Sequence, residues 1–116
     1  MTIDSKGFVY VADRINHRIQ KFTPEHRFVD MFDTKGSKPG QLNCPSGITV
    51  DDNDLLYITE VDNHRVSIFS TNGKFIHCFG ECGNKKELFI HPRCLSFDIY
   101  GYLYVCDMDN KRVVLY

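Results

Sequence analysis

Three stretches of the chain each combine residue types that could carry out acid–base or anion-binding chemistry. The first holds Asp13, Asn16, His17 and Arg18. A histidine can move protons near neutral pH, a carboxylate can orient it, and an arginine can bind an anionic group. The same order of residue types returns twice, with lysine in place of histidine in the last copy: Glu60, Asn63, His64, Arg65, Asp107, Asn110, Lys111 and Arg112. The pattern indicates either a composite site or a repeated structural unit.

The spacing of the three stretches favours the structural interpretation. Asn16, Asn63 and Asn110 are separated by 47 residues both times, a period typical of repeat architectures. Each repeat must form the same turn, in which an acid and an Asn accept backbone N–H bonds and an Arg pairs with a carboxylate. We therefore assign a structural role to the acid, Asn and Arg of every copy, and we predict no catalytic residue.

Cysteine and acidic residues add little evidence for a metal. The chain has five cysteines, and an odd number without paired spacing argues against a disulfide framework. Cys78 and Cys82 lie near His77 and His91, but the rest of a zinc-ligand pattern is missing. The acidic run at 51–54 lacks the Gly and the distal Glu of a calcium loop, and we expect it to form a tight turn. We expect free thiols in a reducing, cytoplasmic setting, no metal and no other cofactor.

Length and charge limit the class of protein. The 116 residues suffice for one ordinary domain, and a net charge of -1 gives no global attraction to nucleic acid or membrane. No apolar run approaches the roughly 18 residues of a membrane span. The N-terminal residues lack the apolar core of a signal peptide.

Short strands and tight turns are predicted around each copy of the motif. In the middle copy, a first strand at 47–50 and a second rich in β-branched and aromatic residues precede a third at 65–69 and a fourth at 75–79. The first copy has its third and fourth strands at 18–22 and 28–32, and the last copy has its first strand at 94–97. Asn72-Gly73 is a hairpin signal because this pair accepts positive φ. Longer polar loops, ending at Pro45 and Pro92, connect the copies, and no segment shows helical periodicity.

Four antiparallel strands repeated in this way describe the blades of a β-propeller, an all-β fold. We assign residues 1–46 to a blade lacking most of its inner strand, 47–93 to a complete blade, and 94–116 to a blade lacking its outer strand. A closed propeller needs at least four blades. We therefore expect the remaining blades in a longer form of the same polypeptide, with closure by oligomerisation as the alternative.

The middle copy carries the fullest motif, as PSGITVD at 45–51, LYITE at 56–60, NHRVSIF at 63–69, GKFI at 73–76 and FG at 79–80. These residues resemble the NHL repeat. Glu60 in place of Asp and Lys111 in place of His are mild departures, and the linker at 83–90 departs further. The resemblance implies part of a six-bladed propeller. It is most like the C-terminal NHL domain of tripartite-motif (TRIM) RING-type ubiquitin ligases, which binds RNA or protein.

Strand direction alternates within a blade, so the turns between second and third strands and the loops between blades share one side, here called the loop face. Its charged residues and histidines are Arg14, Lys35, Lys38, Lys85, Lys86, Arg93, Lys111, His17, His64, His91, Asp33, Asp62, Glu81, Glu87 and Asp109. The opposite face carries Asp4, Asp51, Asp52, Asp54, Asp98 and Glu25 against Lys6, Arg27 and Lys74. A mildly basic face could follow a phosphate backbone, although turns are also charged because they are solvated.

The resemblance implies that the loop face recognises RNA, by phosphate contacts and stacking, or a protein partner. The candidate contact residues are Arg14, His17, His64, Arg93 and Lys111. The parent would be a RING-type ubiquitin ligase, and without its RING this chain should not be an enzyme. One alternative is a protein-interaction scaffold that binds no RNA. Another is a metal-dependent enzyme like the amidating lyase that shares the repeat, but lysine at a would-be ligand position argues against it.

Overall fold

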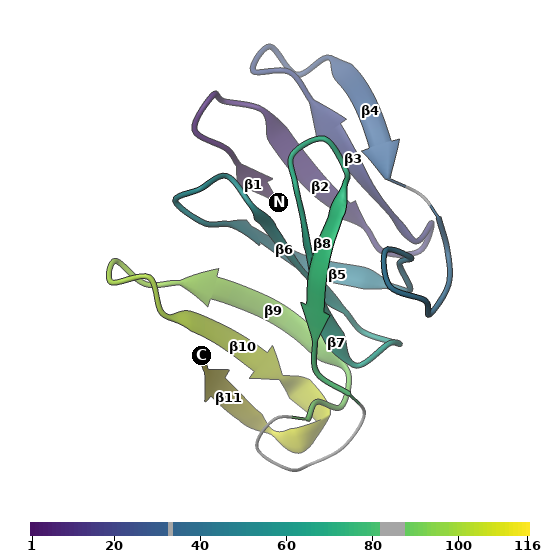
Figure 1. The fold of residues 1–116 in the computed structure, drawn as a ribbon, viewed down its shortest axis with the longest axis vertical. Helices are drawn as coiled ribbons and strands as arrows, with labels where there is room; N and C mark the ends of the chain where they lie inside the picture. Colours follow the sequence, from purple (N-terminus) through teal and green to yellow (C-terminus); the bar gives the residue numbers. More distant parts are fainter. Residues whose placement is uncertain (33, 82–87) are drawn as a thin grey trace.

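The computed structural model describes residues 1–32, 34–81 and 88–116, and within them every regular element is a strand except one 3-10 turn. The strands form three antiparallel sheets, called blades 1 to 3 (Figure 1). Blade 1 contains β1 (Thr2–Ile3), β2 (Val9–Asp13), β3 (Arg18–Phe22) and β4 (Phe28–Phe32). Blade 2 contains β5 (Pro45–Val50), β6 (Leu56–Glu60), β7 (Arg65–Phe69) and β8 (Phe75–Phe79). Blade 3 contains β9 (Pro92–Phe97), β10 (Leu103–Asp107), the turn η1 (Met108–Asn110) and β11 (Arg112–Leu115).

The predicted all-β propeller architecture is confirmed, and β3, β4, β7 and β8 have the predicted bounds. The inner strands differ from the prediction, because β5 and β9 begin at Pro45 and Pro92 rather than two residues later. A proline is tolerated as the first residue of a strand, where its missing N–H breaks no ladder bond. The pairing of β5 with β6 then shifts register between Pro45 and Ile48.

The turn that precedes the second strand is built in the same way in every blade. Gly7, Asp54 and Gly101 occupy one repeat position, and all three have positive φ. Upstream of each, the carboxylate of Asp4, Asp51 or Asp98 accepts two backbone N–H bonds from its own turn. These acids of the opposite face therefore shape turns, which agrees with the interpretation of the run at 51–54 as a turn.

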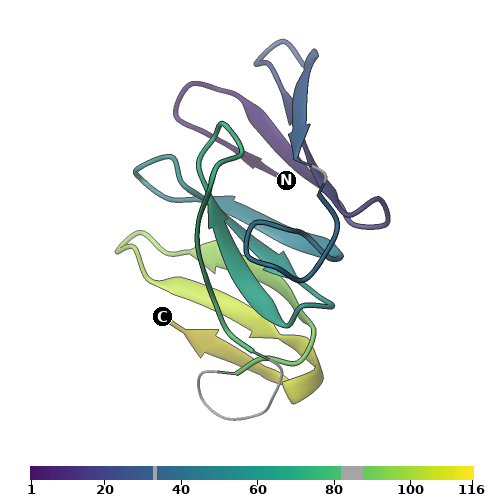
Figure 2. The same ribbon diagram turned by 45° about the vertical axis from the view of Figure 1, so that its right-hand side comes forward.

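The blades stack in chain order, as both ribbon views show (Figures 1 and 2). Apolar side chains fill the two junctions between them. Tyr10 and Ile19 of blade 1 pack in one cluster with Ile48, Leu56 and Ile58 of blade 2. The second cluster joins blades 2 and 3 through Val66, Phe89, Leu95, Leu103 and Val105. Blade 2 is covered on both sides, and all five residues of β7 are buried.

Within the described ranges, no helix is long and apolar enough to cross a membrane. The sequence predictions that concern Asp33, Cys82, Lys85, Lys86 and Glu87 fall on residues outside those the structure describes.

Candidate functional site

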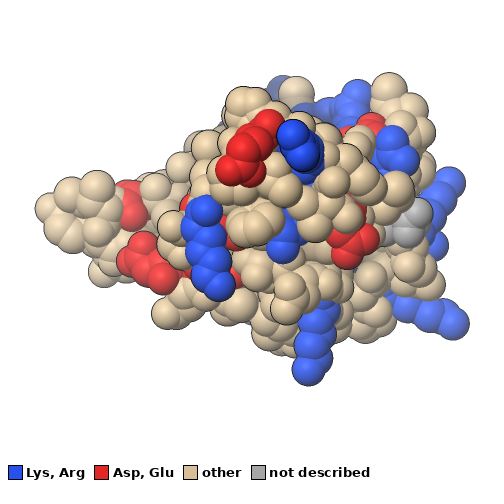
Figure 3. Space-filling model, turned by 90° about the horizontal axis from the view of Figure 1, so that it is seen from above, with Lys and Arg blue, Asp and Glu red and all other residues tan. Residues whose placement is uncertain are grey.

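The antiparallel order of each blade brings the β2–β3, β6–β7 and β10–β11 turns to one edge, together with the linkers between blades. This edge, the loop face, lies on the right of Figure 1. Seen from above, Lys and Arg side chains gather toward the same side, with Asp and Glu between them and on the left (Figure 3). The turns and linkers therefore define the face on which a partner-binding site was predicted.

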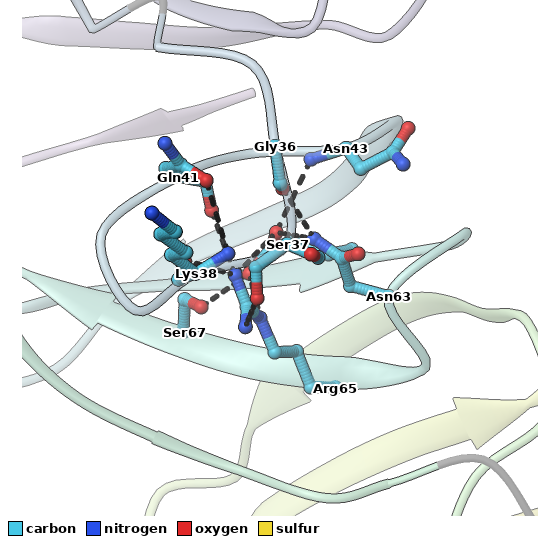
Figure 4. Close-up of polar contacts among 9 residues, drawn as sticks. Gly36, Ser37, Lys38, Gln41, Asn43, Asn63, Arg65 and Ser67 are labelled. Atoms are coloured by element: carbon cyan, nitrogen blue, oxygen red, sulfur yellow. Dashed lines mark hydrogen bonds and ion pairs between the residues drawn. The ribbon is translucent and has the colours of Figure 1, made fainter.

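The acid, Asn and Arg of blade 2 form a buried network beneath this face (Figure 4). Glu60 is fully buried, and its Oε2 accepts a 2.7 Å bond from Arg65 Nε. Asn63 Nδ2 donates to Glu60 Oε1 at 2.8 Å and to the carbonyl of Gly36 at 2.9 Å. The remaining guanidinium N–H groups reach the preceding linker, at the carbonyls of Ser37, Lys38 and Gln41 (2.8, 3.1 and 2.8 Å). One side chain thus joins the linker to its blade.

The other two copies repeat this geometry in part. In blade 3, Asp107 is buried and accepts bonds from Arg112 Nε at 2.8 Å and Asn110 at 2.7 Å, while Arg112 also donates to the carbonyl of Leu88 at 2.7 Å. In blade 1, Arg18 Nε lies 2.7 Å from Asp13. Hydrogen bonds from Asn16 and Arg18 hold the pKa of Asp13 below its ordinary value.

Histidine at the next position links one blade to the next. His17 Nδ1 accepts a 2.9 Å bond from the backbone N–H of Cys44, and His64 Nδ1 accepts a 3.0 Å bond from that of His91. Both histidines, and Lys111 at the same repeat position, have φ of 52–53°. An accepting Nδ1 requires the neutral tautomer with its proton on Nε2. His17 and His64 lie at successive blade junctions, and their roles as partner contacts remain predictions.

Four residues beside these histidines were not among the predicted contacts. Cys44 and His91 share one repeat position, and Asp62 and Asp109 share another. Cys44 Sγ donates to Asp62 Oδ2 at 3.1 Å, and the His91 ring bonds to Asp109 in the equivalent place. Burial, followed by the contact with Asp62, raises the pKa of the Cys44 thiol. The sequence signal that could have identified these residues is the 47-residue spacing, because Cys44 and His91, and likewise Asp62 and Asp109, are separated by that interval.

The exposed charges of the loop face are of both signs. Its exposed cations are Arg14, Lys35, Lys38 and Lys111, whose side chains make no hydrogen bond or ion pair within the described residues. Asp62, Glu81 and Asp109 are exposed acids on the same face. Arg93, on β9, is half-buried, and in the described part of the chain its buried Nε has no hydrogen-bond partner. Among the described residues, no group of three or more His, Cys, Asp or Glu could hold a metal ion.

Comparison with known families accounts for the repeated geometry. Residues 1–22 and 42–69 match the model of the NHL repeat. These two segments carry NHL repeats. The matched segments contain β1 to β3 of blade 1 and β5 to β7 of blade 2 with their acid–Asn–Arg networks. A search of curated protein sequences finds no match.

Solved structures similar to this chain are β-propeller proteins. A streptogramin B lyase shares 15% identity with a TM-score of 0.69 over 98% of this chain and 38% of its own. Virginiamycin B lyase from Staphylococcus aureus shares 18% identity with a TM-score of 0.67, over 99% of this chain and 39% of its own. An auxiliary nutrient binding protein from Bacteroides thetaiotaomicron shares 15% identity with a TM-score of 0.72, over 92% of this chain and 34% of its own. At these identities the likeness concerns the fold alone. The chain spans about two fifths of the length of these lyases or less.

Proposed function

We propose that these NHL repeats serve binding rather than catalysis, and that the loop face binds a protein partner. The observation that carries the proposal is a set of exposed cations without an ion-pair partner among the described residues, Arg14, Lys35, Lys38 and Lys111, on the same face as the exposed acids Asp62 and Asp109. Charged groups of both signs, carried on the turns and linkers of one face, suit a protein surface with complementary charges. The networks of Arg65 and Arg112 support this role, because they anchor the linkers that present the face.

Single-stranded or hairpin RNA is the second candidate partner. The same four cations favour it, since each could neutralise a phosphate. In this version Arg14, His17, His64, Arg93 and Lys111 would be the contacts, and the parent protein would be a TRIM-type ubiquitin ligase in the cytoplasm. The two candidates share one face of the chain and differ in salt dependence and in the class of molecule retained.

Charge reversal on the two faces tests the proposal. The loop-face variant is Arg14→Glu/Lys111→Glu, and the matched control is Lys6→Glu/Lys74→Glu on the opposite face. Wild type and both variants are immobilised, and bound proteins and RNA are identified by mass spectrometry and sequencing. We expect proteins that are retained by wild type and by the control variant and lost from the loop-face variant, without enriched RNA.

Two other outcomes would replace this conclusion. Equal retention by both variants would move the binding site away from the loop face. Retention of single-stranded RNA that weakens steeply with salt, and that the loop-face variant loses, would favour the RNA candidate over the protein one.

A further inference from the structure

Cys94 and Cys106 lie opposite each other on neighbouring strands of blade 3. Strands β9 and β10 are antiparallel, and their register pairs Cys106 directly with Cys94. Directly opposed residues have Cα atoms about 4.5 or 5.5 Å apart, and disulfides span Cα separations of roughly 4.4–6.8 Å. We propose that the two cysteines form a dithiol site that is oxidised reversibly to a Cys94–Cys106 cross-strand disulfide.

The strand register brings the two side chains together in the reduced protein. Opposed residues of an antiparallel pair project to the same side of the sheet, so the register places the Cys94 and Cys106 side chains next to each other. Cys94 is exposed, whereas Cys106 is partly buried. Burial, and then its neighbour Cys94, raises the pKa of the Cys106 thiol. An oxidant therefore reaches Cys94 first, and Cys106 is placed to resolve the product.

The reaction with a small-molecule disulfide such as oxidised glutathione proceeds in two exchange steps. The Cys94 thiolate attacks one sulfur of glutathione disulfide, forming a mixed disulfide and releasing one glutathione thiolate. Cys106, after losing its proton to solvent, attacks the Cys94 sulfur and releases the second glutathione. Two protein thiols are oxidised, one glutathione disulfide is reduced to two thiols, and the two protons from the protein balance the two released thiolates.

The repeat shows that this site is peculiar to blade 3. The corresponding residues of blade 2 are Gly47 and Thr59, which lie against blade 3. A Cβ added to Gly47 would come within 2.8 Å of the Arg93 carbonyl oxygen and 2.9 Å of Leu95 Cδ2. Blade 2 thus has no room for a side chain at the position where blade 3 carries the exposed Cys94.

The other described cysteines lack such a partner. Cys78 on β8 pairs with Ser67, and the Cys44 thiol donates to Asp62. Within the residues that the structure describes, Cys94 and Cys106 are therefore the opposed pair. Oxidation should select them over Cys44 and Cys78, which serve as internal controls.

The test uses the 116-residue chain in glutathione buffers of increasing oxidised-to-reduced ratio. Samples are quenched with acid, alkylated and examined by intact-mass and non-reduced peptide mass spectrometry. We expect the loss of two of the five alkylatable thiols, a cross-linked peptide containing Cys94 and Cys106, and full reversal by dithiothreitol. Cys106→Ser should instead accumulate a glutathione adduct on Cys94, while Cys44→Ser and Cys78→Ser should form the cross-link as wild type does.

The same measurement in concentrated urea shows whether the fold causes the selectivity. Unfolding removes the β9–β10 register, so the preference for this pair should then fall to that of the other cysteine pairs. The proposal is overturned if the native chain retains all its thiols, pairs Cys94 or Cys106 with another cysteine, stops at glutathione adducts, or shows the same selectivity in urea.

Discussion

At the scale of single residues, copies of one motif differ in burial. The Arg65 side chain is 9% exposed and that of its partner Glu60 is fully buried, whereas the side chains of Arg18 and Asp13 are 31% and 22% exposed. The difference arises from the linker, since its carbonyl groups cover the Arg65 guanidinium. The same residue types therefore contribute differently to stability, because hydrogen bonds to a buried charge cannot be replaced by water.

Arg65→Lys is the first test of this difference. A lysine keeps the charge but cannot reach Glu60 and the three linker carbonyls together, because it lacks the planar fork of arginine. We expect a loss of about 2–3 kcal/mol in the free energy of unfolding, measured by urea denaturation. The matched variant Arg18→Lys, at the equivalent exposed position, should lose much less. Equal losses would show that burial beneath the linker does not set the role of the motif.

At the scale of elements, the turns and linkers of neighbouring blades are joined through histidine. The β6–β7 turn holds His64 with its ring beside that of His91, the two centroids 4.6 Å apart, and its Nδ1 accepts the backbone N–H of His91. Burial, and then the nearby His91, lowers the pKa of His64, while Asp62, Asp109 and Asp107 act in the opposite direction. The junction between blades 2 and 3 therefore depends on a neutral imidazole.

A pH dependence of stability arises from this lowered pKa. Between the ordinary value of 6.5 and the lowered one, the unfolded chain binds more protons at this position than the folded chain. The contribution of His64 to stability is thus fully present above about pH 6.5 and is lost as the pH falls through the lowered pKa. We expect the His64 ring, followed by NMR, to titrate below 6.5, and urea stability to decline with acidification.

His64→Asn is the matched variant for this measurement. Asparagine tolerates the positive φ of the position and carries no proton in this range. It should remove part of the acid-induced loss of stability between about pH 7.5 and pH 5. A His64 ring that titrates at or above its ordinary pKa, or a variant with the same pH profile as wild type, would contradict the role assigned to the imidazole.

At the scale of the whole molecule, the apolar clusters at the two junctions between blades stabilise the fold. Repeat proteins bury their apolar surface between neighbouring repeats, and among the described residues blade 2 has an apolar cluster on both sides. Phe69 lies in the first junction, 2% exposed, with its ring 6.2 Å from Phe32 and 5.7 Å from Phe75. Tyr116 occupies the equivalent repeat position in blade 3 and is 40% exposed.

Replacing Phe69 and Tyr116 by alanine compares a buried ring with a partly exposed ring at the same repeat position. Phe69→Ala should cost about 3–5 kcal/mol because it leaves a cavity in a packed junction. Tyr116→Ala should cost about 1 kcal/mol, since less area leaves water there on folding. Urea denaturation followed by circular dichroism measures both, and Phe69→Leu provides an intermediate case if the alanine variant fails to fold. A larger loss for Tyr116→Ala than for Phe69→Ala would contradict this account of the stack.

The sequence alone determined the local architecture. The 47-residue period, the Asn-Gly and Asp-containing turns and the β-branched runs predicted the strands β3, β4, β7 and β8 with their bounds. These features are readable because turn chemistry and strand alternation depend on residues close together in the chain. The sequence prediction starts the inner strands two residues late, because it ends the linkers at Pro45 and Pro92, whereas these prolines are the first residues of β5 and β9.

Only the tertiary structure decided which copies of a repeated residue are buried and what each contacts. The Nδ1 partners of His17 and His64 lie 27 residues away, across a blade junction. The linker carbonyls that cover Arg65, and the register that opposes Cys94 to Cys106, are likewise absent from any local pattern. Identical motifs carry identical local signals, and they differ only through stacking and strand register, which are set by residues far apart in the sequence.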